Sequence, residues 1–172
     1  RAHGDSEGTK IGMGWPERVD IIKWINRILS WEPNARIVLH GVSMGAATVL
    51  MASGEDLPGN VKAVIADCGY TSEWDEFQRE ADALHIPWFP VLNATSVLSK
   101  IRDGYDFKQA SALAQVKKSR IPTLFIHGSS DELVPYSMLG ELYAAAACEK
   151  EELTVEGAGH ALSSSVAPTL YW

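Results

Sequence analysis

The chain has 172 residues, of which 46% are hydrophobic and 22% charged, and its formal net charge is −7. This length and composition predict a single folded domain and exclude a disordered segment. The acidic balance argues against nucleic acid or an anionic membrane surface as a partner, and the sequence shows no signal peptide or membrane-spanning stretch.

Hydrophobic periodicity divides the chain into alternating helices and strands. Apolar residues recur at helical spacing in the first segment, where Pro16 suits a first-turn position. We expect helices at residues 16–31, 46–52 and 136–148, and strands at residues 36–40, 61–66, 123–127 and 153–156. Strands separated by helices indicate a parallel sheet with right-handed crossovers, so the predicted fold class is α/β.

The longest interval between predicted strands is rich in aromatic residues and proline, and it includes residues 71–110. Its early part carries many charges and is predicted to be a helix with a solvated charged face. These charged residues are Glu73, Asp75, Glu76, Arg79, Glu80 and Asp82.

The sequence Gly41-Val42-Ser43-Met44-Gly45 has the form G-x-S-x-G and lies between a predicted strand and a predicted helix. A serine on such a turn has a strained backbone and projects its hydroxyl above the sheet. We expect no room for a side chain at either flanking glycine. The helix N-terminus offers N–H groups, including that of Met44, to a developing oxyanion. The pattern predicts Ser43 as a nucleophile, although the motif alone also occurs in ordinary loops.

A serine nucleophile needs a base within hydrogen-bond reach and an acid that orients the base. Asp131 follows the predicted strand at 123–127, and His160 follows the one at 153–156. Both therefore fall where open α/β sheets place their sites. Alone, Asp131 could be a loop or capping residue with Glu132 as a competing carboxylate, and His160 could be a surface histidine. Because Asp131 and His160 each follow a predicted strand, they are predicted to act together with Ser43.

The remaining histidines and the cysteines suggest no further chemistry. His40 and His127 each precede a glycine at a strand end, where we expect them to hold loop backbone or to pack beneath the site. Cys68 and Cys148 are expected to be buried thiols and not a disulfide. No cysteine pair, H-E-x-x-H motif or carboxylate cluster indicates a metal, and the predicted chemistry needs no cofactor.

Taken together, Ser43, Asp131 and His160 resemble the serine α/β-hydrolase superfamily. The opening Arg1-Ala2-His3-Gly4-Asp5-Ser6-Glu7-Gly8 is similar to the R-x-H/G-G-x-S-x-G segment that follows the fourth strand in many members. The nearer resemblance is to bacterial cell-surface or Bem46-like hydrolases, distant relatives of prolyl-oligopeptidase-type and dienelactone-hydrolase-type enzymes. It covers essentially the whole chain and is closest at residues 11–15, 66–72 and 157–161.

This resemblance implies that the chain is an internal piece of a longer protein, truncated at both ends. Members of the superfamily begin with several strands before the segment that here starts at Arg1, and they continue into a final helix after the histidine. The resemblance therefore implies the C-terminal part of a mostly parallel α/β-hydrolase sheet. Of two oxyanion donors, the Met44 N–H is present and the other is expected upstream of Arg1.

The resemblance also implies a role for the long interval between strands. We expect residues 1–172 to form one partial α/β-hydrolase domain in which residues 71–110 are a small helical cap or lid. Trp88 and Phe89 are candidates to line an acyl pocket beneath this cap. The alternative is that these aromatic rings only pack the cap helices on the sheet.

The function expected from these residues is hydrolysis of carboxylic esters through an acyl-enzyme. Ser43 would attack the carbonyl, His160 would take its proton, and Asp131 would orient the imidazole. One alternative is a peptidase or amidase with the same triad. Another is a non-catalytic fragment or binding scaffold, because the N-terminal strands and one oxyanion donor are expected to lie outside this chain.

The expected partner is a small-molecule ester or amide substrate, with no nucleic acid. The strand that leads to Ser43 would expose one edge, which favours self-association or a complementing chain. Two locations are compatible with the resemblance: the bacterial cytoplasm and a membrane-anchored cell surface.

Overall fold

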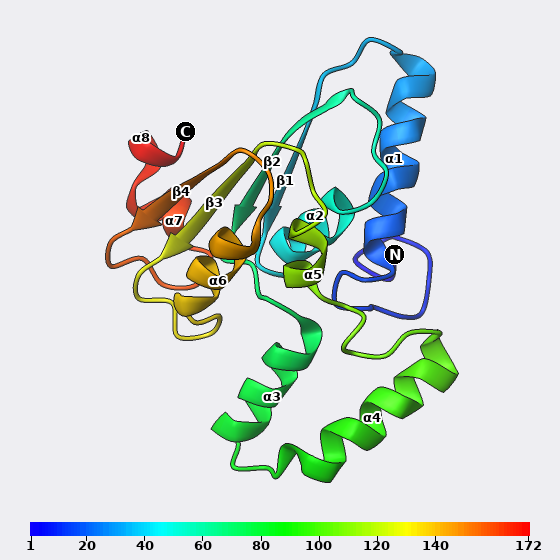
Figure 1. The fold of residues 1–172 in the computed structure, drawn as a ribbon, viewed down its shortest axis with the longest axis vertical. Helices are drawn as coiled ribbons and strands as arrows, with labels where there is room; N and C mark the ends of the chain where they lie inside the picture. Colours follow the sequence, from blue (N-terminus) through cyan, green and yellow to red (C-terminus); the bar gives the residue numbers. More distant parts are fainter.

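The computed structural model describes residues 1–172 and contains one four-stranded sheet (Figure 1). Its strands are β1 (Ile37–Val42), β2 (Val61–Asp67), β3 (Thr123–Gly128) and β4 (Lys150–Val155). They lie in the order β1-β2-β3-β4, and each neighbouring pair is parallel. The predicted parallel α/β sheet is confirmed, although β4 begins at Lys150 and not at residue 153 because its polar first residues also pair with β3.

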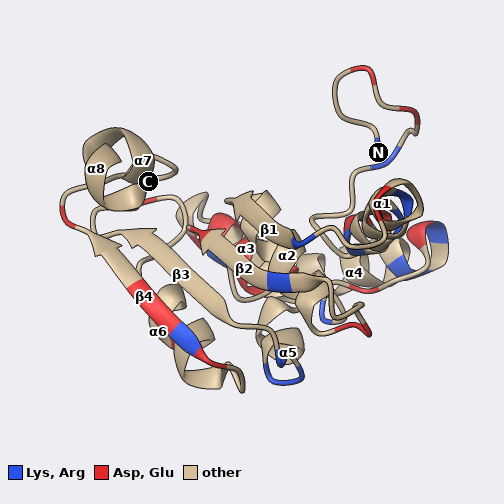
Figure 2. Cartoon of the chain, turned by 90° about the horizontal axis from the view of Figure 1, so that it is seen from above, with Lys and Arg blue, Asp and Glu red and all other residues tan.

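Helices cover both faces of this sheet. They are α1 (Glu17–Trp31), α2 (Met44–Ser53), α3 (Glu73–Ala83), α4 (Trp88–Asp103), α5 (Ala112–Val116), α6 (Ser137–Ala145), α7 (Ser163–Val166) and α8 (Pro168–Tyr171). Helices α2, α5 and α6 lie on one face, and the short α7 and α8 lie on the other (Figures 1 and 2). None of these helices has both the length and the apolar character that crossing a membrane requires.

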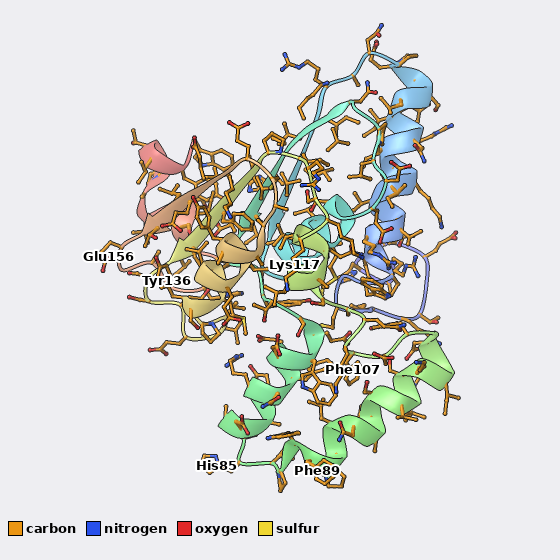
Figure 3. All side chains as sticks on the ribbon, in the orientation of Figure 1. His85, Phe89, Phe107, Lys117, Tyr136 and Glu156 are labelled. Carbon is orange, nitrogen blue, oxygen red and sulfur yellow. The ribbon has the colours of Figure 1, made fainter.

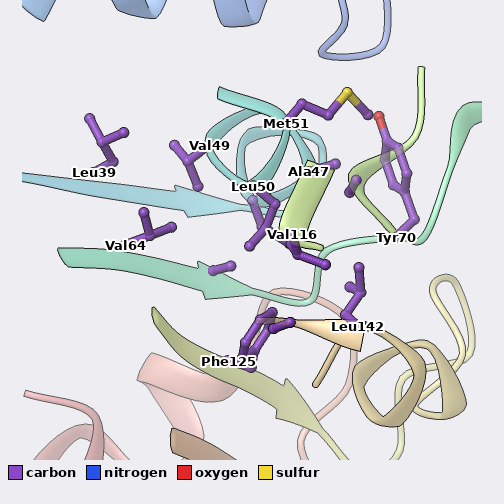
Figure 4. Packing of buried hydrophobic residues seen from close by; sticks show 14 of the residues in the cluster. Leu39, Ala47, Val49, Leu50, Met51, Val64, Tyr70, Val116, Phe125 and Leu142 are labelled. Atoms are coloured by element: carbon purple, nitrogen blue, oxygen red, sulfur yellow. The ribbon is translucent and has the colours of Figure 1, made fainter. Parts of the chain in front are cut away.

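The main hydrophobic core lies between the sheet and helix α2. This helix is buried on all sides from Ala46 to Ser53, which fits its run of small and aliphatic residues. Side chains from α2, including Leu50 and Met51, meet those of the strands and of helices α5 and α6 (Figure 4). Because α2 begins directly after Ser43, this packing fixes the backbone that carries the predicted nucleophile.

Helices α3 and α4 leave the sheet at the end where the strands terminate (Figure 1). Helix α3 begins at a capping serine, because the Ser72 hydroxyl accepts a hydrogen bond from the Asp75 N–H at 3.0 Å. Ser72 also forms an antiparallel bridge with Ser111, so the two ends of the segment that contains α3 and α4 are joined beside the sheet. Helix α4 ends at Asp103 and is followed by Gly104, whose φ of +86° is the left-handed conformation common after helices.

The charged face expected on helix α3 is only partly in solvent. Glu73 is 2% exposed and Glu76 is also buried, so the prediction that both are solvated was wrong. Glu73 accepts a long hydrogen bond from the Tyr105 hydroxyl at 3.3 Å, and its second carboxyl oxygen has no partner. Burial of the first turn against the segment after α4 produces this environment, which helical periodicity within α3 did not indicate.

Glu73 is expected to make the stability of the fold depend on pH. Burial raises the pKa of its carboxyl to about 8, and the charges of Glu17 and Asp103 act in the same direction. Unfolding restores the ordinary pKa near 4.5, so between these values the folded state binds more protons than the unfolded state. The free energy of unfolding should therefore fall as pH rises from about 4.5 to about 8, by about 1 kcal/mol per pH unit.

The substitution Glu73→Gln removes this dependence and should stabilise the protein increasingly, relative to wild type, as pH rises toward 8. Chemical denaturation across this pH range measures the effect. Asp82→Asn, an exposed carboxylate on the same helix, serves as the control and should leave the dependence unchanged. A constant difference between Glu73→Gln and wild type at all pH values would contradict the assignment.

Candidate active site

Ser43 lies on a strained turn between β1 and α2. Its φ of 56° and ψ of −119° place a residue with a side chain in a region that costs of order 1–3 kcal/mol. Its N–H donates to the Asp67 carbonyl at 2.8 Å, and its carbonyl accepts from the Ala47 N–H at 3.0 Å. Met44 is the first residue of α2, so its N–H has no partner within the helix.

The two glycines of this turn have different structural roles. A Cβ atom at Gly41 would lie 2.2 Å from the Gly45 carbonyl oxygen, so the close approach of strand and helix requires glycine there. A Cβ atom at Gly45 would meet nothing within 4 Å outside the backbone of its own helix. The expectation that both flanking positions exclude a side chain is therefore correct for Gly41 and wrong for Gly45.

The structure brings the three residues predicted from the sequence into one hydrogen-bonded chain. The Ser43 Oγ atom lies 2.7 Å from His160 Nε2, and His160 Nδ1 lies 2.8 Å from Asp131 Oδ2. An ionised carboxylate only accepts hydrogen bonds, so Nδ1 carries the proton and Nε2 is left to accept from the serine hydroxyl. This is the tautomer that a general base for Ser43 requires.

Asp131 is held by the backbone of its own loop. The Leu133 and Val134 N–H groups donate to its Oδ1 atom at 3.0 and 2.9 Å, and the carboxylate is fully buried. His127 Nε2 donates to the Val134 carbonyl at 2.9 Å and lies 3.3 Å from Asp131 Oδ2. The buried His127 therefore holds the backbone of the loop that carries Asp131, as expected from its position at the end of a strand.

The loops that carry Asp131 and His160 are joined to each other. The Ser130 N–H donates to the Ala158 carbonyl at 3.0 Å, and the Gly157 N–H donates to the Ser129 hydroxyl at 2.8 Å. A Cβ atom at Gly128 would lie 2.2 Å from the same Ala158 oxygen, so the second loop passes directly over this glycine. These contacts fix the separation of the acid and the imidazole.

Cys68 is a buried thiol that lies beside the hydrogen-bonded residues Asp131 and His160. One ligand atom each from Cys68, Asp131 and His160 lie within 4.8 Å of one another. Burial, with the negative charge of Asp67, raises the pKa of the Cys68 thiol to about 12. A cysteine coordinates a metal as a thiolate, and the carboxylate and imidazole atoms already bond to each other. These atoms are therefore arranged as a hydrogen-bonded pair beside a protonated thiol.

The structure does not bring Trp88 and Phe89 to this site. They lie at the start of α4, where the Phe89 backbone is not helical, are 36% and 64% exposed, and pack edge to face against each other. Figure 3 shows Phe89 at the N-terminal start of α4, which lies away from the sheet. Three cavities, of about 270, 370 and 430 Å³, are lined neither by these two residues nor by the three residues of the hydrogen-bonded chain.

Two curated relatives resemble this sequence over most of its length. Protein YqkD of Bacillus subtilis is 32% identical over 95% of the chain and 54% of its own length. Protein Rv2307c of Mycobacterium tuberculosis is 29% identical over 80% of the chain and 42% of its own length. The chain therefore spans about half the length of the curated relatives it matches.

Solved structures show the same fold at low sequence identity. The esterase Pf2001 of Pyrococcus furiosus matches 99% of this chain and 64% of its own, with a TM-score of 0.74 and 21% identity. The acylaminoacyl peptidase of Pyrococcus horikoshii matches 87% of this chain and 24% of its own, with a TM-score of 0.65 and 20% identity. The model of the prolyl oligopeptidase family matches residues 16–168, and the chain therefore belongs to this family of α/β-hydrolase fold.

Proposed function

We propose that this protein is a serine hydrolase that cleaves carboxylic esters through an acyl-enzyme on Ser43. The observation that carries the proposal is the continuous chain from Ser43 Oγ through His160 to Asp131 on a strained turn. Membership of the prolyl oligopeptidase family supports hydrolysis, and the similarity to an esterase over 99% of the chain supports an ester substrate.

The proposed reaction begins with proton transfer from Ser43 Oγ to His160 Nε2 as Oγ bonds to the ester carbonyl carbon. The tetrahedral oxyanion accepts a hydrogen bond from the Met44 N–H at the N-terminus of α2. His160 then gives its proton to the leaving alcohol, and the carbon–oxygen ester bond breaks. In the second half, water gives a proton to His160 and attacks the acyl carbon, after which the proton returns to Ser43 and the acid leaves. Asp131 remains ionised throughout.

The same residues also support cleavage of amides. The acylaminoacyl peptidase among the structural relatives favours this second candidate. The two reactions differ in the leaving group, because an amine must be protonated before it departs, whereas an alcohol can leave more readily. A matched series of p-nitrophenyl esters and aminoacyl p-nitroanilides separates them by the ratio of kcat/KM for esters and amides.

Ser43→Ala is expected to abolish both hydrolysis of short p-nitrophenyl esters and covalent labelling by a fluorophosphonate. The hydroxyl oxygen is the atom that attacks the carbonyl in the proposed reaction, and alanine preserves the backbone of the turn. Ser130→Ala, which removes an exposed hydroxyl in the loop beside Asp131, is the control and should leave both activities close to wild type. Turnover of Ser43→Ala close to that of wild type would exclude the assignment.

We also propose that the chain associates through the open edge of β1 with a second copy of itself. The opposite edge strand, β4, begins with the charged residues Lys150, Glu151 and Glu152, whereas β1 carries no charge (Figure 2). Charged side chains on an edge strand oppose pairing with another chain, and an uncharged edge permits it. Val38 on β1 is 52% exposed, which adds apolar surface at this edge.

Val38→Lys is therefore expected to shift the wild-type chain from dimer to monomer in light scattering coupled to size exclusion. Val97→Lys is the matched control, since Val97 is 59% exposed on α4, away from the sheet edge. A monomeric wild type, or dissociation by both variants alike, would contradict association through β1.

A further inference from the structure

Asp67 is a second buried carboxylate that the proposed reaction does not use. It ends β2, where it pairs in register with Val42 of β1 and Ile126 of β3, and it is 1% exposed. Burial raises the pKa of its carboxyl, while a hydrogen bond from Ser163 acts in the opposite direction. Burying a carboxyl group costs free energy unless polar partners bond to it, so Asp67 needs such partners.

These partners come from the segment that follows His160. The Ser163 hydroxyl donates to Asp67 Oδ1 at 3.0 Å, and Ser163, the first residue of α7, is fully buried. Tyr171 of α8 faces the same carboxyl, and burial, followed by the charge of Asp67, raises the pKa of its hydroxyl. The Tyr171 hydroxyl also lies 2.9 Å from His40 Nε2 on β1. The Asp67 carboxyl thus bonds α7 to the sheet, and His40 bonds α8 to it.

The backbone of Asp67 contacts the other end of the hydrogen-bonded chain. Its carbonyl accepts the N–H of Ser43 at 2.8 Å, and the next residue, Cys68, donates its N–H to the Ile126 carbonyl at 2.8 Å. Asp67 is therefore bonded to the nucleophile through its main chain and to the segment after His160 through its side chain. Ser43 and His160 approach within 2.7 Å of each other from elements that both bond to this residue.

We propose that Asp67 is a positioning residue that holds His160 in line with Ser43, acting through Ser163. This role rests on the proposed function, since it concerns the geometry of the same site. Asp67 does not contact the reacting atoms. A displacement of about 1 Å in a catalytic group can cost up to about 100-fold in rate without removing any catalytic atom. Loss of the Ser163 bond should therefore lower kcat and leave KM nearly unchanged.

Three serines in succession on α7 provide a matched experiment. Ser163→Ala removes the bond to Asp67, whereas Ser165→Ala removes an exposed hydroxyl that makes no hydrogen bond. With a short p-nitrophenyl ester and the full chain, we expect Ser163→Ala to lower kcat about tenfold at nearly constant KM. Ser165→Ala should match wild type.

Substitutions of Asp67 itself distinguish its role as a hydrogen-bond acceptor from the effect of its negative charge. Asp67→Asn retains an oxygen that accepts from Ser163 and should keep most of the wild-type kcat. Asp67→Ala removes the acceptor and should lower kcat at least as far as Ser163→Ala. If hydrogen bonds position His160, kcat should be highest with aspartate at position 67, lower with asparagine and lowest with alanine. Equal losses for Asn and Ala would overturn it.

Hydrogen exchange of the peptide spanning residues 157–167 tests the same inference without turnover. Faster exchange in Ser163→Ala than in Ser165→Ala supports positioning by Asp67. The proposal is overturned if Ser163→Ala and Ser165→Ala have the same exchange rate and the same kcat. It is also overturned if Ser163→Ala lowers only the melting temperature and leaves kcat and exchange unchanged. If the wild-type chain hydrolyses no ester, the proposed function fails, and the exchange comparison still decides whether Asp67 holds the His160 segment.

Discussion

Asp131→Asn is expected to lower kcat for ester hydrolysis by about 10³- to 10⁴-fold. The Leu133 and Val134 N–H groups both donate to Oδ1, so the amide oxygen of asparagine will remain at that position. Its NH₂ group will then face His160 Nδ1, which must accept a hydrogen bond where it now donates one. The imidazole proton is thereby forced onto Nε2, and Nε2 can no longer accept the proton of Ser43.

The adjacent carboxylate provides the control for this prediction. Glu132→Gln changes an exposed side chain in the same loop and removes the same charge. It should leave kcat near the wild-type value, and steady-state kinetics on one ester measures both variants. A larger loss in Glu132→Gln than in Asp131→Asn would show that the acid had been assigned to the wrong residue.

Gly41→Ala is expected to lower kcat/KM by at least about 100-fold and to destabilise the fold by about 1–3 kcal/mol. The new Cβ atom would lie 2.2 Å from the Gly45 oxygen, 2.3 Å from its carbonyl carbon and 2.7 Å from the Ala46 nitrogen. All three are backbone atoms, so only movement of the turn relieves the overlap. That movement displaces Ser43 from His160.

Gly45→Ala is the matched comparison within the same motif. Its Cβ atom meets open space, and alanine is favoured over glycine inside a helix by about 1 kcal/mol. We therefore expect activity close to wild type and a small gain in stability. Denaturant titration and ester kinetics on the two glycine variants measure both effects. If both variants lose activity equally, the close contact at Gly41 is not what holds the turn.

Local patterns in the sequence were sufficient for the sheet and for the turn at Ser43. Apolar runs with helices between them identify parallel strands because both faces of such a sheet are buried. The beginning of β4 was less clear, since Lys150 and Glu151 are polar but lie on an edge strand with access to solvent. The alternation of strands and helices therefore determined the fold class, while strand limits depended on the neighbours of each residue.

The environment of individual side chains was harder to predict. Glu73 belongs to a charged helical pattern, yet tertiary contacts bury it beside Tyr105. Trp88 and Phe89 belong to an apolar pattern, yet they are exposed at the start of α4 and the structure does not bring them to Ser43. Periodicity describes which residues share a face of one element, but burial depends on what packs against that face.

What the sequence determined by itself was the identity and the chain order of the proposed reacting groups. A G-x-S-x-G turn after one strand, and Asp131 and His160 after two later strands, place three groups at one end of a parallel sheet because parallel strands all end there. Tertiary structure alone decided the 2.7 and 2.8 Å contacts between them, the backbone bonds on Asp131 and the links through Asp67. Such hydrogen bonds join residues far apart in the chain, and their lengths depend on packing that no local pattern records.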